Sequence, residues 1–130
     1  MTLLEVMIGT GLLLVAFLAV AGIFAHNLKL QARTQEVTEA SEIGRRLLEE
    51  IRNDPSGLPS GTTVFTPTTP LLPGPPSFPP APFPTVDGSF GTYDITVRVE
   101  PGSVPNVVSV EVQVSWQDGQ GVVLQSFFPN

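Results

Sequence analysis

The chain has 130 residues, no cysteine and a formal net charge of −6. This length provides one small domain with a modest core, which excludes a large active-site domain. The absence of cysteine excludes disulfide bonds, thiolate catalysis and cysteine-based metal sites.

The first 25 residues contain an apolar segment of membrane length. The run Val6 to Ala25 has 20 residues, and Thr10 is its only side chain able to hydrogen-bond. As a helix this run would span about 30 Å, the thickness of the hydrocarbon core of a bilayer. A signal peptide would carry positive charge before its apolar core and a small-residue cleavage site after it, and neither is present. Instead Glu5 precedes the run, and an acidic residue at such a position is predicted to be functional.

The residues Thr2-Leu3-Leu4-Glu5-Val6-Met7-Ile8 resemble the mature amino terminus of the type IV pilin superfamily, which includes pilins, minor pilins and type II secretion pseudopilins. In that family a prepilin peptidase cuts before the mature first residue, methylates the new amine and leaves a glutamate at the fifth position. The family usually begins with Phe, where this chain has Met1, and many members carry a proline where it has Gly22. Met1 is therefore either a processed first residue or an initiator.

This resemblance, which covers about the first 50 residues, implies a structural subunit of an extracellular type IV pilus-like filament. The subunit would be held in the inner membrane, N-methylated at Met1 if processed, and polymerised by the pilus assembly machinery into a helical filament of identical subunits. In the filament, Glu5 would pair with the amine of Met1 in an adjacent subunit. The residues expected to pack in the filament core are Leu3, Leu4, Val6, Ile8, Gly9, Gly11, Leu14, Phe17, Gly22 and Phe24.

Two other interpretations stay open. The chain could be a minor pilin or a type II secretion pseudopilin that primes or caps a pilus or secretion machine, because Leu47–Arg52 and Val114-Ser115-Trp116 also resemble such subunits. A single-pass anchored domain with no role in assembly is the third interpretation, but it leaves Glu5 unexplained.

One α-helix is predicted over residues 1–54. No proline occurs before Pro55, residues 26–53 continue with helix formers, and the residue before a proline is pushed out of the helical region. Apolar residues at spacings of three and four predict a stripe that packs against a partner layer, with charged residues mostly on the other side. The stripe consists of Leu30, Val37, Ala40, Ile43, Leu47, Leu48 and Ile51. The other side consists of Arg33, Glu36, Glu39, Arg46 and Glu50.

Residues 55–91 are expected to form a connecting strap. Nine of the eighteen residues 67–84 are proline, which favours an extended, polyproline-like chain. Leu71, Leu72, Phe78 and Phe83 interrupt this stretch, and we expect them to pack on the sheet or on an adjacent subunit, because a solvated spacer would not need them. Hydroxyl residues beside prolines are typical of O-glycosylated stalks. The candidate acceptors are Thr62, Thr63, Thr66, Thr68, Thr69 and Ser77.

Residues 92–130 are expected to form an antiparallel sheet. Apolar and polar residues alternate over 93–100 and 108–116, and a third strand is predicted over Val122 to Phe128. Turns are predicted at 101–106 and 117–121, and Thr62 to Phe65 is a possible short edge strand. A small sheet needs a packing layer, which the helix stripe would provide. The predicted fold class is therefore α+β, with a long N-terminal helix, a Pro-rich strap and an antiparallel meander.

No catalytic constellation is found, and the chain is not expected to be an enzyme or to need a cofactor or metal. His26 is the sole histidine, and it is interpreted as an interfacial residue at the end of the apolar run. The acids Glu49, Glu50 and Asp54 share turns with three arginines, which favours a solvated ion-pair face over a cation site. From Pro55 onward there are five acids and only Arg98, so direct nucleic-acid binding is disfavoured.

Overall fold

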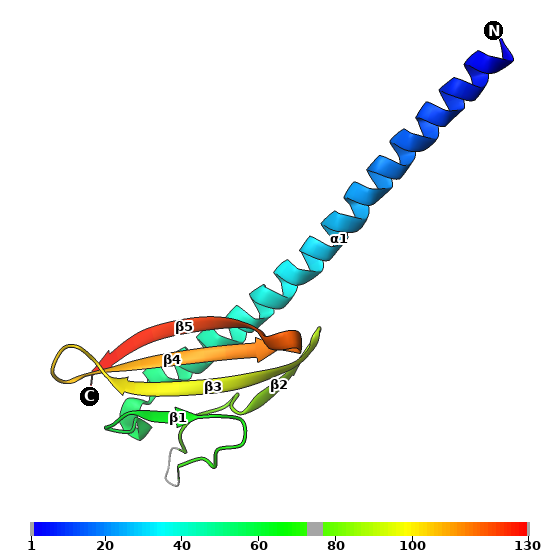
Figure 1. The fold of residues 1–130 in the computed structure, drawn as a ribbon. Helices are drawn as coiled ribbons and strands as arrows, with labels where there is room; N and C mark the ends of the chain where they lie inside the picture. The colour runs from blue at the N-terminus through cyan, green and yellow to red at the C-terminus, as the bar shows by residue number, and fades with distance from the viewer. Residues whose placement is uncertain (1, 73–76, 130) are drawn as a thin grey trace. The chain divides into compact units, whose positions relative to one another are not determined.

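A computed structural model describes residues 2–72 and 77–129 (Figure 1). The elements in chain order are the helix α1 (Leu3–Asn53), a 3₁₀ turn (Pro55–Gly57), β1 (Thr63–Phe65), β2 (Thr85–Gly88), β3 (Gly91–Pro101), β4 (Val107–Trp116), a second 3₁₀ turn (Gln117–Gly119) and β5 (Gln120–Pro129). The chain divides into two compact units, Met1–Gln35 and Glu36–Asn130. The second unit is called the head below. The predicted α+β class is confirmed.

The first unit is helical, and every side chain that the structure describes in it is exposed. The helix ends where the sequence predicts, because Asn53 is its last residue and Pro55 follows after Asp54. The Asp54 carboxylate accepts hydrogen bonds from the backbone N–H and the hydroxyl of Ser56. These bonds stabilise the turn that leads the chain away from the helix.

The head contains an antiparallel sheet with the strand order β1-β3-β4-β5, and β2 also pairs with β3. Both short strands lie along one edge of β3, since Thr63 opposes Val99 while Thr85 opposes Asp94. The three long strands form the predicted meander, and Thr63–Phe65 is the short edge strand expected from the sequence. The strand β2 was not predicted, because it has four residues and directly follows the proline-rich stretch.

The core of the head lies between α1 and one face of this sheet (Figure 1). The helix contributes Ala40, Leu47 and Ile51, all buried, and the sheet contributes alternate residues of β3 and β4. These sheet residues are Tyr93, Ile95, Val97, Val99, Val108, Val110, Val112 and Val114. Gly44 is also buried, and an added Cβ at this position would overlap Leu124 Cδ1 on β5. The absence of a side chain at Gly44 therefore leaves room for Leu124 between the helix and the sheet.

The predicted helix stripe is correct in its second half and wrong at its start. Ile43 and Leu48 pack at the margin of the core, as expected. Val37 is 39% exposed, and Leu30 belongs to the first unit and is 50% exposed. The spacing pattern continues beyond the head, so the pattern by itself could not indicate where packing stops.

The proline-rich segment packs through two of its four large apolar residues. Phe78 and Phe83 are buried, and the ring of Phe78 meets that of Phe65 edge-on with centroids 5.3 Å apart. Leu71 and Leu72 are exposed, so they do not pack on the sheet of this chain, and their packing on an adjacent subunit stays a prediction. Residues 73–76 of the predicted strap lie outside the described residues.

The two connections within the meander, β3 to β4 and β4 to β5, fall inside the predicted turns but are shorter than expected. Strand β3 extends to Pro101, and β5 already begins at Gln120. Asn106 and Gly119 have positive φ angles of 64° and 72°, the left-handed conformation that asparagine and glycine adopt most readily.

Candidate functional site

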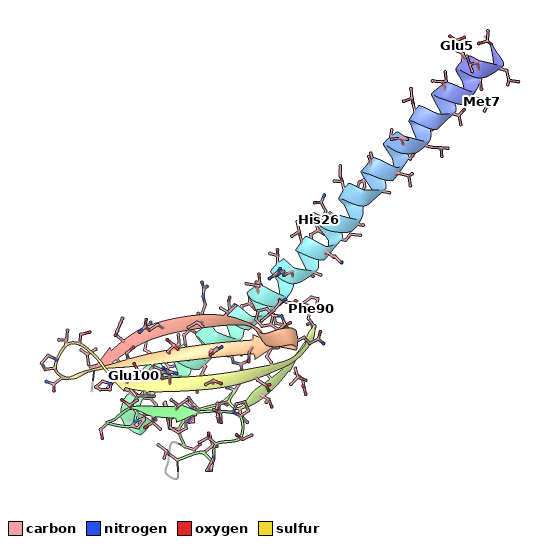
Figure 2. All side chains as sticks on the ribbon, viewed as in Figure 1. Glu5, Met7, His26, Phe90 and Glu100 are labelled. Atoms are coloured by element: carbon pink, nitrogen blue, oxygen red, sulfur yellow. The ribbon has the colours of Figure 1, made fainter. Side chains whose placement is uncertain are left out.

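The candidate site is the apolar amino-terminal part of α1, with Glu5 at its start (Figure 2). An 18-residue window of this helix has a mean hydropathy of 2.5, and none of it is buried. The helix is therefore long and apolar enough to span a membrane. A helix that is apolar on all sides requires lipid or other helices around it.

The amino terminus of the helix is closed by a reciprocal pair of hydrogen bonds between Thr2 and Glu5. The Thr2 backbone N–H donates to Glu5 Oε2 at 3.5 Å, and the Glu5 backbone N–H donates to Thr2 Oγ1 at 3.4 Å. This is the capping-box arrangement, in which the side chains of Thr and Glu three residues apart each accept from the other's backbone N–H. The Glu5 backbone N–H also donates to the Thr2 carbonyl at 3.0 Å. The signal that predicts this cap is the Thr-x-x-Glu spacing of Thr2 and Glu5, which the sequence predictions above do not include. The bond that the Glu5 carboxylate accepts is long, so the carboxylate is only weakly engaged within this chain.

The residues predicted to pack in a filament core are all exposed where the structure describes them. Their exposed fractions run from 52% at Val6 to 81% at Leu3, and an added Cβ at Gly9, Gly11 or Gly22 would meet no atom within 4 Å. The Thr10 hydroxyl donates to the Val6 carbonyl at 2.7 Å, so its polar group is satisfied inside the helix. Met1, the predicted partner of Glu5 and the predicted methylation site, lies outside the described residues.

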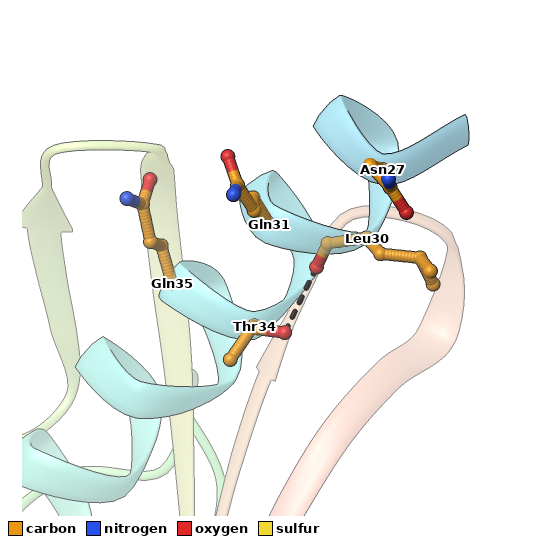
Figure 3. Close-up of a pocket in the computed structure, with 5 residues that line it drawn as sticks. All are labelled: Asn27, Leu30, Gln31, Thr34 and Gln35. Carbon is orange, nitrogen blue, oxygen red and sulfur yellow. Dashed lines mark hydrogen bonds between the residues drawn. The ribbon is translucent and has the colours of Figure 1, made fainter. Parts of the chain in front are cut away.

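Two shallow hollows on this unit mark a change from apolar to polar surface. One of about 290 Å³ is lined by Leu13, Ala16, Phe17 and Val20. The other, of about 600 Å³, is lined by Asn27, Leu30, Gln31, Thr34 and Gln35 (Figure 3). Its lining is mostly amide side chains, with the Thr34 hydroxyl bonded to the Leu30 carbonyl at 2.8 Å. Neither hollow is lined by an ionisable side chain, so neither has the groups needed for acid–base chemistry.

In the head, two carboxylates of α1 bind the end of the sheet. Glu39 accepts hydrogen bonds from the backbone N–H of Ser89 at 2.8 Å and from the Tyr93 hydroxyl at 2.9 Å. Glu36 accepts one from the indole N–H of Trp116 at 3.2 Å. The prediction that these two carboxylates lie on the side of the helix away from its packing layer is therefore wrong. The helix period could not reveal these partners, which are 50 to 80 residues away in the sequence.

These contacts change the ionisation of both partners. The Ser89 backbone N–H, together with the Tyr93 hydroxyl, lowers the pKa of Glu39. Burial, followed by the hydrogen bond to Glu39 and its negative charge, raises the pKa of Tyr93 to about 12. Gly88 is required beside them, because an added Cβ would lie 2.6 Å from Tyr93 Cε2 and 2.7 Å from Glu39 Oε1. This cluster holds the helix on the sheet and offers no vacant group for a substrate.

The hydroxyls proposed as sugar acceptors differ in accessibility. Thr62, Thr68 and Ser77 are exposed, whereas Thr63 is half-buried in β1. The hydroxyls of Thr66 and Thr69 lie 2.8 Å apart and bond each other within a turn. The exposed three are therefore the most accessible candidates.

The acidic and basic side chains at the end of α1, predicted to form an ion-pair face, make no salt bridge with one another in the described residues. In residues 2–72 and 77–129 the structure shows one salt bridge, between Arg98 and Glu100 at 3.6 Å, and none between Arg45, Arg46 or Arg52 and a neighbouring acid. The same described residues contain no group of three His, Asp or Glu side chains that could hold a metal ion. His26 is exposed on the helix (Figure 2).

No protein-family model matches the chain, and no similar protein was found among curated sequences or solved structures.

Proposed function

We propose that the chain is a structural subunit of an extracellular type IV pilus-like filament, held in the inner membrane before assembly. The observation that carries this proposal is the exposed apolar segment Val6 to Ala25 with a single carboxylate, Glu5, at its start. A membrane anchor alone needs only the apolar side chains. The carboxylate becomes useful when the helix leaves the lipid and must choose a register among other helices, since a charge in an apolar environment demands a specific partner.

In this proposal, assembly replaces lipid contacts by contacts between helices. Lipid tails are as apolar as leucine side chains, so close packing and polar pairing must supply the preference for neighbouring helices. Gly9, Gly11 and Gly22 leave open surface where another helix can approach. Glu5 pairs with the amino-terminal amine of Met1 in an adjacent subunit, after cleavage by a prepilin peptidase and methylation of that amine. The weak engagement of Glu5 in its own helix leaves the carboxylate able to make this pair.

The head supplies the filament surface. All buried hydrophobic side chains in the described part of the chain belong to it, from Ala40 to Phe128, so its core does not include the apolar segment. Changes in the apolar segment should therefore leave the head folded. This separation is what an assembly subunit needs, because the segment moves from lipid into a fibre while the head remains unchanged.

Purified fibres test the proposal directly. We expect fibres sheared from the source cells to contain this chain, with a helical reconstruction that fits it in every asymmetric unit. If the chain is present in fibres but far outnumbered by another subunit, it is a minor pilin. Copurification with a secretion machine without surface fibres would indicate a pseudopilin. Complete absence from both would contradict the proposal.

A further inference from the structure

The two edges of the sheet are protected very differently. One edge of β3 is covered by the short strands β1 and β2, which are separated by the proline-rich segment. Short strands and neighbouring prolines discourage further pairing at an edge. The other edge is β5, which has ten residues and contains no charged residue. Within residues 2–72 and 77–129 it pairs only with β4. An uninterrupted, uncharged edge strand is a template for pairing with another strand.

The outer face of β5 carries two large hydrophobic side chains on a largely polar surface. Val123 is 57% exposed and Phe127 is 62% exposed, while their partners on β4 are Gln113 and Ser109. Gln125 lies between them in the strand, opposite Glu111. Nothing in the described part of the head covers these two apolar residues.

We propose that the occupant of this edge is a second copy of the chain, with β5 pairing antiparallel to β5 about a two-fold axis at Gln125. In this register Val123 of each copy faces Phe127 of the other. Gln125, whose side-chain amide donates to Ser109 Oγ on β4 at 2.8 Å, lies opposite its counterpart on the two-fold axis. Cross-strand pairs of aromatic and β-branched residues are stabilising. Nearly the full length of β5 takes part, because Gly121 then faces Pro129.

Charge favours this edge over the rest of the surface. Two copies each with a net charge of −6 repel one another. Pairing through β5 brings together two strands that carry no charged residue. Beside it, a groove between α1 and β5 is lined by Arg45, Glu49 and Arg52, with the centre of β5 at its wall. Since the groove holds both signs of charge, it is compatible with a symmetric copy of itself. A two-fold contact closes on itself, so it forms a pair and is distinct from the proposed polymerisation through the helix.

Disulfide trapping tests the contact, because the chain has no native cysteine. The full chain in detergent micelles should form a disulfide-linked dimer when Gln125→Cys is oxidised. The matched control is Gln113→Cys, also an exposed glutamine on the outer face but one strand in from the edge, and it should remain monomeric. A mixture of Val123→Cys and Phe127→Cys should give mainly the mixed dimer. Equal trapping of Gln125→Cys and Gln113→Cys, or none of either, would overturn the proposal.

A second pair of variants distinguishes pairing through β5 from association through the apolar helix. Val123→Lys places like charges at the contact and should abolish the dimer seen by native mass spectrometry, whereas Gln113→Lys should retain it. Unchanged Trp116 fluorescence would show that the head is folded in both variants. A dimer that persists in Val123→Lys would overturn the proposal, even if filament assembly itself proves correct.

Discussion

The charge of Glu5 should be needed for assembly, while its hydrogen bonds in the helix cap should not. Glu5→Gln separates the two roles, since glutamine can replace glutamate in a capping box but carries no charge. Thr2→Ala is the complementary change, because it removes the hydroxyl that accepts the Glu5 backbone N–H and keeps the carboxylate. Glu5→Leu removes both functions and makes the helix more apolar. Glu42→Gln neutralises an exposed carboxylate elsewhere on α1 and is the matched control.

The two contributions differ enough in magnitude to be told apart. Loss of a cap costs about 0.5–2 kcal/mol, and the bond lengths of 3.4 and 3.5 Å in this helix place its cap at the lower end. Removing one partner of a buried charge pair costs about 3–5 kcal/mol. At about 1.4 kcal/mol for each factor of ten, loss of the pair shifts a subunit equilibrium by about two to three and a half orders of magnitude.

Each variant is expressed as the only copy, the membrane-held subunit is measured by blotting, and sheared fibres are counted. Glu5→Gln and Glu5→Leu should have normal subunit levels and almost no fibres, whereas Thr2→Ala and Glu42→Gln should assemble. Normal fibre yield from Glu5→Leu at normal subunit levels would refute the assigned role. Loss of fibres in Thr2→Ala equal to that in Glu5→Gln would instead assign the effect to the helix cap. If the chain is a minor subunit, Glu5→Leu should reduce the number of fibres and leave their length unchanged.

Four further predictions concern the head, the connecting segment and the assembled helix. Leu47 is fully buried, so Leu47→Ala should lower the free energy of unfolding by about 2–5 kcal/mol in denaturant titrations followed by Trp fluorescence; a loss below about 1 kcal/mol would contradict its place in the core. The pKa of Tyr93 is raised from its ordinary value of 10.0 to about 12 in the folded head. The bond from Tyr93 to Glu39 should therefore stabilise the head fully below pH 10, and this stabilisation should be lost as the pH rises towards 12. The pKa of Glu39 is lowered from its ordinary value of 4.5 in the folded head. The stabilisation of the head by the Glu39 carboxylate should therefore be present above pH 4.5 and disappear as the pH falls through the pKa of Glu39 in the folded head. Tyr93→Phe should lack the alkaline loss, and an unchanged pH profile would count against the contact. Exposed hydroxyls such as Thr68 should carry sugar, so the intact mass should exceed that of the methylated polypeptide; an equal mass would remove this prediction. The segment Gly9 to Gly22 should lose regular helical hydrogen bonding on assembly, because glycine lowers the cost of extension, and a fibre structure with unbroken bonding there would contradict it.

The sequence alone determined the features that depend on local periodicity. Strict alternation predicted the long strands β3 and β4, and a third strand was predicted over Val122 to Phe128, where β5 lies. The absence of proline before Pro55 predicted the length of α1. The composition of the first 25 residues indicated a membrane-length helix and singled out Glu5. The helix cap is local as well, because its signal is the Thr-x-x-Glu spacing of Thr2 and Glu5.

The tertiary structure decided what the hydrophobic periodicity of the sequence leaves open: where along an element packing stops, and which residues distant in the sequence contact each other. Val37 continues the helix stripe yet is exposed, while Glu36 and Glu39 belong to the charged side of the pattern yet bind the sheet through Trp116 and Tyr93. Likewise Phe78 is buried and Leu72, opposite it in an isolated bridge, is exposed. A periodic pattern specifies the face of its own element, because it arises from the geometry of that element. Whether a given face is covered depends on the position of a second element, and in this chain that element lies 50 to 80 residues away.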